Sequence, residues 1–199
     1  MQWMGQGFLV TMAVGLAVVA SPVFAETYQS IQQRRPDLFH ESTGFRVARH
    51  RAPTPENIPE PAKVIEAGKA ADLLSNGAIA IDVSGALQSR FDELEGTWLV
   101  RGPRESLPGA VWLPEVGRGV LEADMIRYLE TNLAALTSGN KDHGIIVFCM
   151  ADCWMSWNAA QRIAQLGYRS VFWFRDGTNG WTDLDRELAP VLPVPVEIE

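Results

Sequence analysis

Residues 145–160 read IIVFCMADCWMSWNAA and contain both cysteines of the chain. The run Ile145–Phe148 is continuously apolar, which is typical of a buried strand. Downstream, Ala159, Ile163 and Leu166 recur at helical spacing and Gly167 is a natural stop, so we expect a helix over about residues 157–166 with Ser156 as its N-cap. The sequence therefore predicts a strand, a short loop that begins at Cys149, and then a helix.

The same alternation extends in both directions along the chain. Apolar runs predict short strands, and residues at helical spacing predict helices between them. We expect strands at 64–65, 78–83, 110–113 and 170–174, helices at 67–74 and 121–137, and a long polar loop at 84–107. Strands that alternate with helices predict an α/β fold, with a mainly parallel sheet and helices on both faces.

The first 25 residues have the pattern of a secretory signal peptide. They contain no charged side chain, their apolar run spans residues 8–20, and small or short residues precede a cleavage site after Ala25. That apolar run of about 13 residues is short of the roughly 20 that a membrane-spanning helix needs. We therefore expect export to an oxidising compartment, the periplasm, with no membrane span after cleavage.

The rest of the chain divides into three segments. Residues 26–61 form an N-terminal arm rich in proline and arginine, with four prolines between Pro53 and Pro61, a density that favours extended backbone. We expect this arm to wrap over the domain surface rather than to act as a docking segment. Residues 62–190 form the domain and 191–199 a C-terminal tail.

Composition excludes several classes of protein. Hydrophobic residues make up 47% and charged residues 21% of the 199 residues, as in ordinary globular chains. A net charge of −7 argues against a nucleic-acid binder, which normally presents a basic face. Two cysteines are too few for a disulfide-rich scaffold or a four-cysteine zinc site, and we predict no metal site.

The position of Cys149 is the strongest functional signal. Ligands of open α/β sheets bind at the carboxyl ends of the strands, and the loop leads into a helix N-terminus whose backbone N–H groups stabilise a thiolate. The alternatives are a small buried hydrophobe at Cys149 or a structural disulfide from Cys149 to Cys153. A disulfide that closes so short a loop adds little stability, which weakens the structural alternative.

The motif order resembles that of a rhodanese-like domain over about residues 62–190. The matching residues are Asp82 at a strand end, the segment 107–110 (LPGA), the Cys149 loop, and the closing segment 176–181 (DGTNGW). The resemblance implies a rhodanese-like three-layer fold in which Cys149 carries a persulfide. It also implies that Asp82 accepts hydrogen bonds from the active-site loop, with simple turn capping as the alternative.

The closer similarity is to an exported protein family named for PQQ-dependent catabolism and a CXXCW motif. Cys149, Cys153 and Trp154 in the spacing Cys-x-x-x-Cys-Trp carry this similarity, together with residues 155–160 (MSWNAA), 44–46 (GFR) and 51–55 (RAPTP). It implies a periplasmic protein near PQQ-dependent alcohol oxidation, with a PQQ-dependent dehydrogenase or a cytochrome c as partner. No cofactor is predicted beyond a cysteine persulfide, because the association with PQQ is by family only.

Departures from the rhodanese pattern argue against classical thiosulfate chemistry. Met155 stands where a rhodanese loop often has arginine, and Asp152 adds a negative charge to the loop. A missing cation and an added anion both disfavour a dianionic donor and the thiolate itself. Arg101 and Arg104 could supply the missing cation, although solvation at the surface is the simpler expectation.

Three hypotheses follow for the Cys149/Cys153 loop. Cys149 takes up sulfur as a persulfide and Cys153 resolves it, or the pair performs thiol–disulfide exchange, or the segment is a non-catalytic binding module with a structural disulfide. Such a module would dock a periplasmic dehydrogenase or cytochrome, or bind a soft metal. The candidate site is made up of Cys149 and Cys153 as reacting residues, the loop residues Met150, Ala151, Asp152, Trp154, Met155 and Ser156, and the supporting residues Asp82, Trp157 and Asn158.

Overall fold

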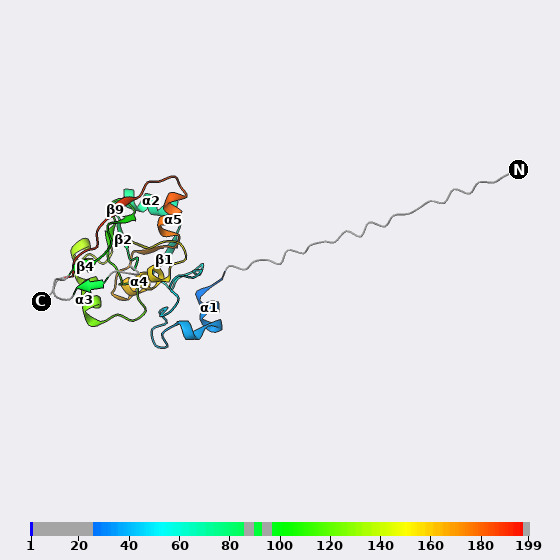
Figure 1. Cartoon of the computed structure of the whole chain (residues 1–199), viewed down its shortest axis with the longest axis horizontal. Coiled ribbons are helices and arrows are strands. Elements are labelled where there is room, and N and C mark those ends of the chain that lie inside the picture. The colour runs from blue at the N-terminus through cyan, green and yellow to red at the C-terminus, as the bar shows by residue number, and fades with distance from the viewer. Residues whose placement is uncertain (2–25, 86–89, 93–96, 197–199) are drawn as a thin grey trace.

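A five-stranded parallel sheet forms the centre of the molecule (Figure 1). The computed structural model describes Met1 and residues 26–85, 90–92 and 97–196, so the predicted signal peptide lies outside the described residues. The strand order is β1-β8-β7-β2-β6, and every neighbouring pair is parallel. The strands are β1 (Lys63–Ile65), β2 (Ile79–Asp82), β6 (Val111–Trp112), β7 (Ile145–Phe148) and β8 (Val171–Phe174).

The register brings three strand ends together at one edge of the sheet. Asp82 of β2 lies opposite Phe148 of β7, and Phe148 lies opposite Phe174 of β8. The chain leaves these three strands side by side, so the segments that follow Asp82, Phe148 and Phe174 meet at this edge. The cysteine loop is the middle one of the three.

Successive residues of the central strands point to opposite faces of the sheet, and both sets are apolar. Helices therefore cover both faces. Ile81, Val147 and Trp173 pack with α3 (Ala123–Thr137) and α4 (Trp154–Gln165). Ala80, Ile146 and Phe174 pack on the other face with α2 (Ala67–Ser75) and α5 (Gly177–Thr182). The predicted α/β class with helices on both faces is confirmed.

Two short antiparallel pairs lie outside the central sheet. Strand β3 (Arg90–Asp92) pairs with β4 (Thr97–Leu99), and β5 (Arg104–Ser106) pairs with β9 (Ala189–Val191). The expectation that residues 84–107 form only a loop is therefore wrong. A strand such as β5 is hard to recognise locally, because its partner lies more than 80 residues away in the sequence.

The arm contains a short helix, a 3-10 turn and extended backbone. Helix α1 spans Tyr28–Arg34 and the turn η1 spans Pro36–Leu38. Ile31, Leu38 and Phe45 of the arm are buried. Among the described residues, no helix is both long and apolar enough to cross a membrane.

Candidate functional site

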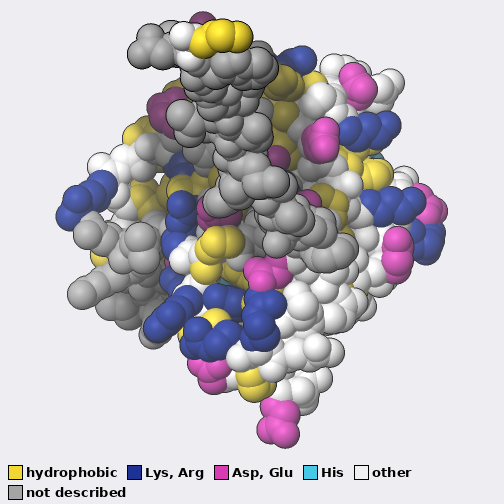
Figure 2. All heavy atoms as spheres, turned by 90° about the vertical axis from the view of Figure 1, so that its right-hand side faces the viewer, with side chains coloured by type: hydrophobic (Ala, Val, Ile, Leu, Met, Phe, Trp, Pro, Cys, Tyr) yellow, Lys and Arg dark blue, Asp and Glu magenta, His cyan; other side chains and the backbone are white. Residues whose placement is uncertain are grey.

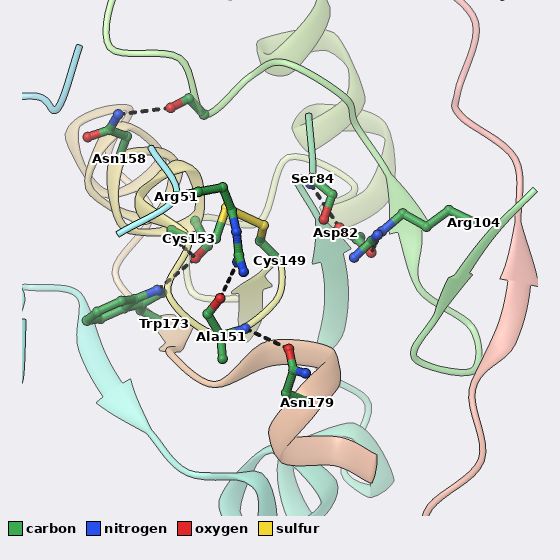
Figure 3. The surroundings of a disulfide bond; sticks show 12 residues. Arg51, Asp82, Ser84, Arg104, Cys149, Ala151, Cys153, Asn158, Trp173 and Asn179 are labelled. Carbon is green, nitrogen blue, oxygen red and sulfur yellow. Dashed lines mark hydrogen bonds and ion pairs between the residues drawn. A yellow bond between two sulfur atoms is a disulfide. The ribbon is translucent and has the colours of Figure 1, made fainter. Parts of the chain in front are cut away.

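Cys149 and Cys153 form a disulfide at the sheet edge (Figure 3). Cys149 directly follows β7, and Cys153 is the N-cap residue of α4. Their Cα atoms are 6.3 Å apart, and the two residues are 2% and 3% exposed. The fold therefore places the two sulfur atoms within bonding distance of each other, at the edge where α/β sheets bind ligands.

Helix α4 begins at Trp154, about three residues earlier than expected, so Ser156 is not its N-cap. Ser156 lies in the first turn, where its Oγ donates to the carbonyl of Cys153 (3.0 Å) and accepts from Trp173 Nε1 (3.0 Å). Ser156 thus ties the end of the loop to β8 and is itself completely buried.

Helix α5 holds one side of the loop. The amide of Thr178 donates to the carbonyl of Cys149 (3.1 Å), and the amide of Ala151 donates to Asn179 Oδ1 (3.0 Å). Met150 and Gly177 form an isolated antiparallel bridge. The loop is therefore held by α5 through backbone and side-chain contacts, and the amide of Ala151 bonds Asn179 rather than a sulfur atom.

The arm holds the other side of the loop, through backbone pairing at residues 50–52. The amide of Trp154 donates to the carbonyl of His50 (2.8 Å), and the amide of Ala52 donates to the carbonyl of Asp152 (3.1 Å). Arg51 pairs with Cys153 as an isolated antiparallel bridge, and its guanidinium donates to the carbonyl of Ala151. The arm thus forms part of the site, which is the principal feature that sequence reasoning missed.

The tryptophans of the site are covered by the arm. Trp154 and Trp157 are 0% and 1% exposed, and their ring centroids are 5.1 Å apart. The Nε1 atom of Trp154 donates to the carbonyl of Pro53, and that of Trp157 donates to the carbonyl of Asn57. An aromatic loop that docks a partner through exposed tryptophan rings does not fit this arrangement, because the arm already occupies those rings.

Asn158 fastens the arm to α4 rather than contacting the cysteines. Its Oδ1 accepts from the amide of Arg46 (2.9 Å), and its Nδ2 donates to the carbonyls of Arg46 (2.8 Å) and Gly117 (2.9 Å). The guanidinium of Arg46 lies 4.6 Å from the centroid of the Trp154 ring. Asn158 therefore supports the site by positioning the arm. The remaining loop residue, Met155, is buried.

Asp82 makes its hydrogen bonds away from the cysteine loop. Its carboxylate accepts from the amide of Ser84 (2.9 Å) and from Arg104 Nε (2.7 Å), as Figure 3 shows. It also accepts from Ser106 Oγ (2.6 Å). The reason is alternation along β2, because Asp82 shares the face of Ala80, whereas Cys149 packs in the cluster on the opposite face. Of the two alternatives for Asp82, the contact with the loop is therefore wrong, whereas the bond from the Ser84 amide caps the turn after β2. Arg104 pairs with Asp82 instead of supplying a cation to Cys149.

Burial shifts the pKa values of three basic groups, two in the arm and one on α4. Burial, followed by the nearby charge of Arg118, lowers the pKa of the His50 imidazole. Burial also lowers the pKa of Arg46, and it lowers that of Arg162 to about 10. Arg162 donates to the carbonyls of Val116, Arg118 and Gly119, which fixes the segment that packs on α4.

The chemistry available at this edge is that of sulfur. The described residues hold no cluster of three or more His, Cys, Asp or Glu side chains able to bind a metal ion. Two cysteines that reach each other can exchange between a dithiol and a disulfide. Arg51 and Asn179 both contact Ala151 of the cysteine loop, and neither was predicted as a site residue. The only sequence signal for Arg51 was its place in the RAPTP segment that carries the family resemblance.

A family model described as the rhodanese-like domain matches residues 66–184. A search of the curated proteins finds no match. Among solved structures, the chain is similar to a thiosulfate sulfurtransferase from Pseudomonas aeruginosa, with 20% identity and a TM-score of 0.44 over 69% of this chain and 22% of that chain. It is also similar to an EanB variant in complex with hercynine, with 20% identity and a TM-score of 0.41 over 76% of this chain and 36% of that chain.

A third similar structure is protein hp1203 from Helicobacter pylori 26695, with 20% identity and a TM-score of 0.33 over 59% of this chain and 81% of that chain. The chain spans only about a fifth to a third of the length of the first two structures. The family match covers more than half of this chain and includes β2, both cysteines and α5. This chain belongs to the rhodanese-like domain family.

Proposed function

We propose that this protein accepts sulfur at Cys149 and resolves the resulting persulfide with Cys153. The observation that carries the proposal is the Cys149–Cys153 disulfide at the carboxyl edge of the sheet. A cysteine within bonding distance of the residue that would bear the persulfide is placed to attack it. The rhodanese-like family supports a sulfur-transfer role for the domain.

The proposed reaction has two steps. First, the Cys149 thiolate attacks the outer sulfur of a donor R–S–SH; a new S–S bond forms, the S–S bond of the donor breaks, and R–S⁻ leaves. Second, the Cys153 thiolate attacks Sγ of Cys149 and expels HS⁻, which leaves the Cys149–Cys153 disulfide. The protein is oxidised by two electrons and the persulfide is reduced, so turnover requires a dithiol reductant.

The positions of the two cysteines favour this order of roles. Cys149 lies in the loop that leaves β7, at the edge where three strand ends meet. Cys153 is paired with the arm through its own backbone and caps α4. Cys149 is therefore assigned as the residue that receives sulfur, and Cys153 as the residue that resolves it.

The proposed cellular setting rests on sequence alone. The pattern of residues 1–25 supports export to the periplasm, where a disulfide persists. The motif Cys-x-x-x-Cys-Trp and residues 44–46 and 51–55 support a relationship to the CXXCW family associated with PQQ-dependent catabolism. We extend the proposal to a partner of that pathway, a PQQ-dependent dehydrogenase or a cytochrome c, without a resident cofactor in this chain.

A single-turnover assay tests the proposed function. The reduced protein, freed of reductant, is mixed with glutathione persulfide. After the protein is removed, released sulfide is measured as the double adduct that it forms with monobromobimane, which chromatography separates from the single adducts of glutathione and its persulfide. We expect about one equivalent of sulfide from the wild type and none above background from Cys149→Ser or Cys153→Ser. Arg127→Gln, which changes an exposed ion pair on α3, serves as the matched surface control and should behave as the wild type does.

Two results would contradict the proposal. Sulfide release that continues in Cys149→Ser would remove this residue from the reaction. A wild-type protein that releases no sulfide and stays reduced would leave the non-catalytic alternative, in which Cys149–Cys153 is a structural disulfide.

A further inference from the structure

We propose that Arg51 of the arm selects anionic sulfur donors for Cys149. The inference rests on the proposed function and adds a residue that determines specificity, because Arg51 would favour donors with negative charge beside their reactive sulfur. The segment 149–156 of this chain contains no Lys or Arg, and Arg51 of the arm contacts it through its guanidinium.

Two contacts fix Arg51 at the loop. Its backbone pairs with Cys153, and its guanidinium donates to the carbonyl of Ala151, the residue midway in sequence between the two cysteines. The adjoining amide of Ala52 binds the carbonyl of Asp152, which anchors the arm on the next residue of the loop. In Figure 3 the Arg51 side chain runs along the loop beside the disulfide. The backbone and the guanidinium of Arg51 are thus both held at the reactive segment.

The charges around the loop leave Arg51 available for an anion. On the arm, Arg34 pairs with Glu26 and Arg35 with Asp37. Arg51 has no ion pair among the described residues, and the exposed carboxylate of Asp152 in the neighbouring loop does not pair with it. The Arg51 side chain is exposed, and the one partner it bonds within the described part of the chain is a neutral carbonyl. Figure 2 shows Lys and Arg side chains grouped on the face of the molecule that carries the arm. An exposed cation held beside a nucleophile raises the local concentration of anions although the whole chain is at −7.

A guanidinium beside the cysteine loop favours sulfur transfer from an anionic donor. When the Cys149 thiolate attacks thiosulfate, the new Cys149 S–S bond forms, the S–S bond of the donor breaks, and sulfite leaves. Negative charge is present on both reactants and on the leaving group. A guanidinium beside the loop reduces their repulsion during approach and lowers the barrier to an anionic donor relative to a neutral one.

A pair of alkylating reagents measures this selection without any sulfur transfer. Iodoacetate is anionic and iodoacetamide is neutral, and both alkylate a thiolate with loss of iodide. The full chain is reduced, each reagent is added in turn, and the rate at Cys149 is followed by peptide mass mapping. The ratio of the two rates cancels thiolate content and accessibility, so a purely structural effect of a variant leaves it unchanged.

We expect the iodoacetate-to-iodoacetamide ratio to fall about threefold in Arg51→Gln and about tenfold in Arg51→Glu. Arg51→Lys should retain the wild-type ratio because it keeps the charge. Arg49→Gln is the matched control, since it removes the same charge two residues away from a side chain that is exposed and makes no contact with the loop among the described residues. Raising the salt concentration should bring the wild-type ratio toward that of Arg51→Gln.

Three results would overturn the inference. The first is a ratio that is the same in the wild type, Arg51→Gln and Arg51→Glu. The second is an equal fall in Arg49→Gln. The third is a reduced wild type in which Cys149 reacts with neither reagent, because no donor would then reach the sulfur. The sulfide assay can fail while the ratio still depends on Arg51, so failure of the proposed function is distinguishable from failure of this inference.

Discussion

The imidazole of His50 joins the arm to the cysteine loop through both its side chain and its backbone. Its Nε2–H donates to the carbonyl of Arg46 (3.0 Å), and its own carbonyl accepts the amide of Trp154. Burial and the charges of Arg118 and Arg46 disfavour the imidazolium, so the pKa of His50 in the folded chain lies below its ordinary value of 6.5. The neutral ring is the form that fits the docked arm.

Acid should therefore weaken the folded state through His50. The unfolded chain takes up a proton at a higher pH than the folded chain, so the contribution of His50 to stability is complete above pH 6.5 and is lost as the pH falls below that value. We expect the free energy of unfolding in urea to differ less between about pH 7.5 and about pH 5.5 in His50→Gln than in the wild type. An identical pH dependence in the two proteins would show that His50 does not contribute.

Single residues at the site were predicted where local sequence decides their place. Cys149 follows an apolar strand and could be located from the IIVF run alone. Asp82 was placed correctly at the end of β2, but its hydrogen-bond partners were not predicted. Two of these partners, Arg104 and Ser106, lie in β5, which pairs with the distant strand β9. They reach Asp82 on the face of the sheet opposite to Cys149.

Among the elements, the contact between α5 and the cysteine loop leaves no space for a side chain at Gly177. This residue has a positive φ of 52°, and a Cβ added there would lie 2.5 Å from the carbonyl oxygen of Cys149. The close approach allows Thr178 to donate its amide to the same carbonyl. A glycine at the start of α5 is thus required both by the backbone conformation and by the loop that packs against it.

Gly177→Ala should separate α5 from the loop. We expect a loss of at least about 2 kcal/mol in the free energy of unfolding, from backbone strain and the clash with Cys149 together. Gly68→Ala is the matched control, because Gly68 lies in α2 with no atom near its added Cβ, and it should be neutral or stabilising by up to about 1 kcal/mol. Equal stability of the two variants in urea titrations would refute this account of the α5 contact.

The elements of the central sheet could be predicted because their signals are local. Apolar runs gave β2, β7 and β8, and helical spacing gave α2 and α3, with ends within about two residues of those observed. The start of α4 was misplaced because Ser156 is a residue type that favours N-caps, whereas the true N-cap, Cys153, makes no side-chain capping bond. The strands β5 and β9 were missed since their pairing is long-range.

For the molecule as a whole, the arm packs on the domain, and its residues Ile31 and Ile58 share an apolar core with the tryptophans of α4. Asn158 is the buried link, with bonds to both backbone groups of Arg46 and to the carbonyl of Gly117. A second link lies at the sheet edge, where Arg175 pairs with Glu56 at 2.7 Å. The sequence predicted an arm on the domain surface, but proline density carries no information about which surface it covers.

Asn158→Ala should loosen the arm more than the rest of the molecule. The amide of Arg46 and the carbonyl of Gly117 would lose their side-chain partner inside the protein, and we expect about 3 kcal/mol lower stability. Local opening of the arm should raise tryptic cleavage after Arg49 and Arg51 by about tenfold. Asn132→Ala, which removes a similar bond within α3, should leave cleavage in the arm unchanged. Cleavage that rises equally in arm and domain would instead show that they unfold together.

The most direct test of the Cys149/Cys153 relay is the intact mass of Cys153→Ser after brief exposure of the reduced protein to glutathione persulfide. Without its resolving thiol, the protein should become one sulfur atom heavier, with the added sulfur on Cys149 and removable by reductant. The wild type treated in parallel should instead become two hydrogens lighter. An unchanged mass of Cys153→Ser, or an added sulfur on a residue other than Cys149, would contradict the relay.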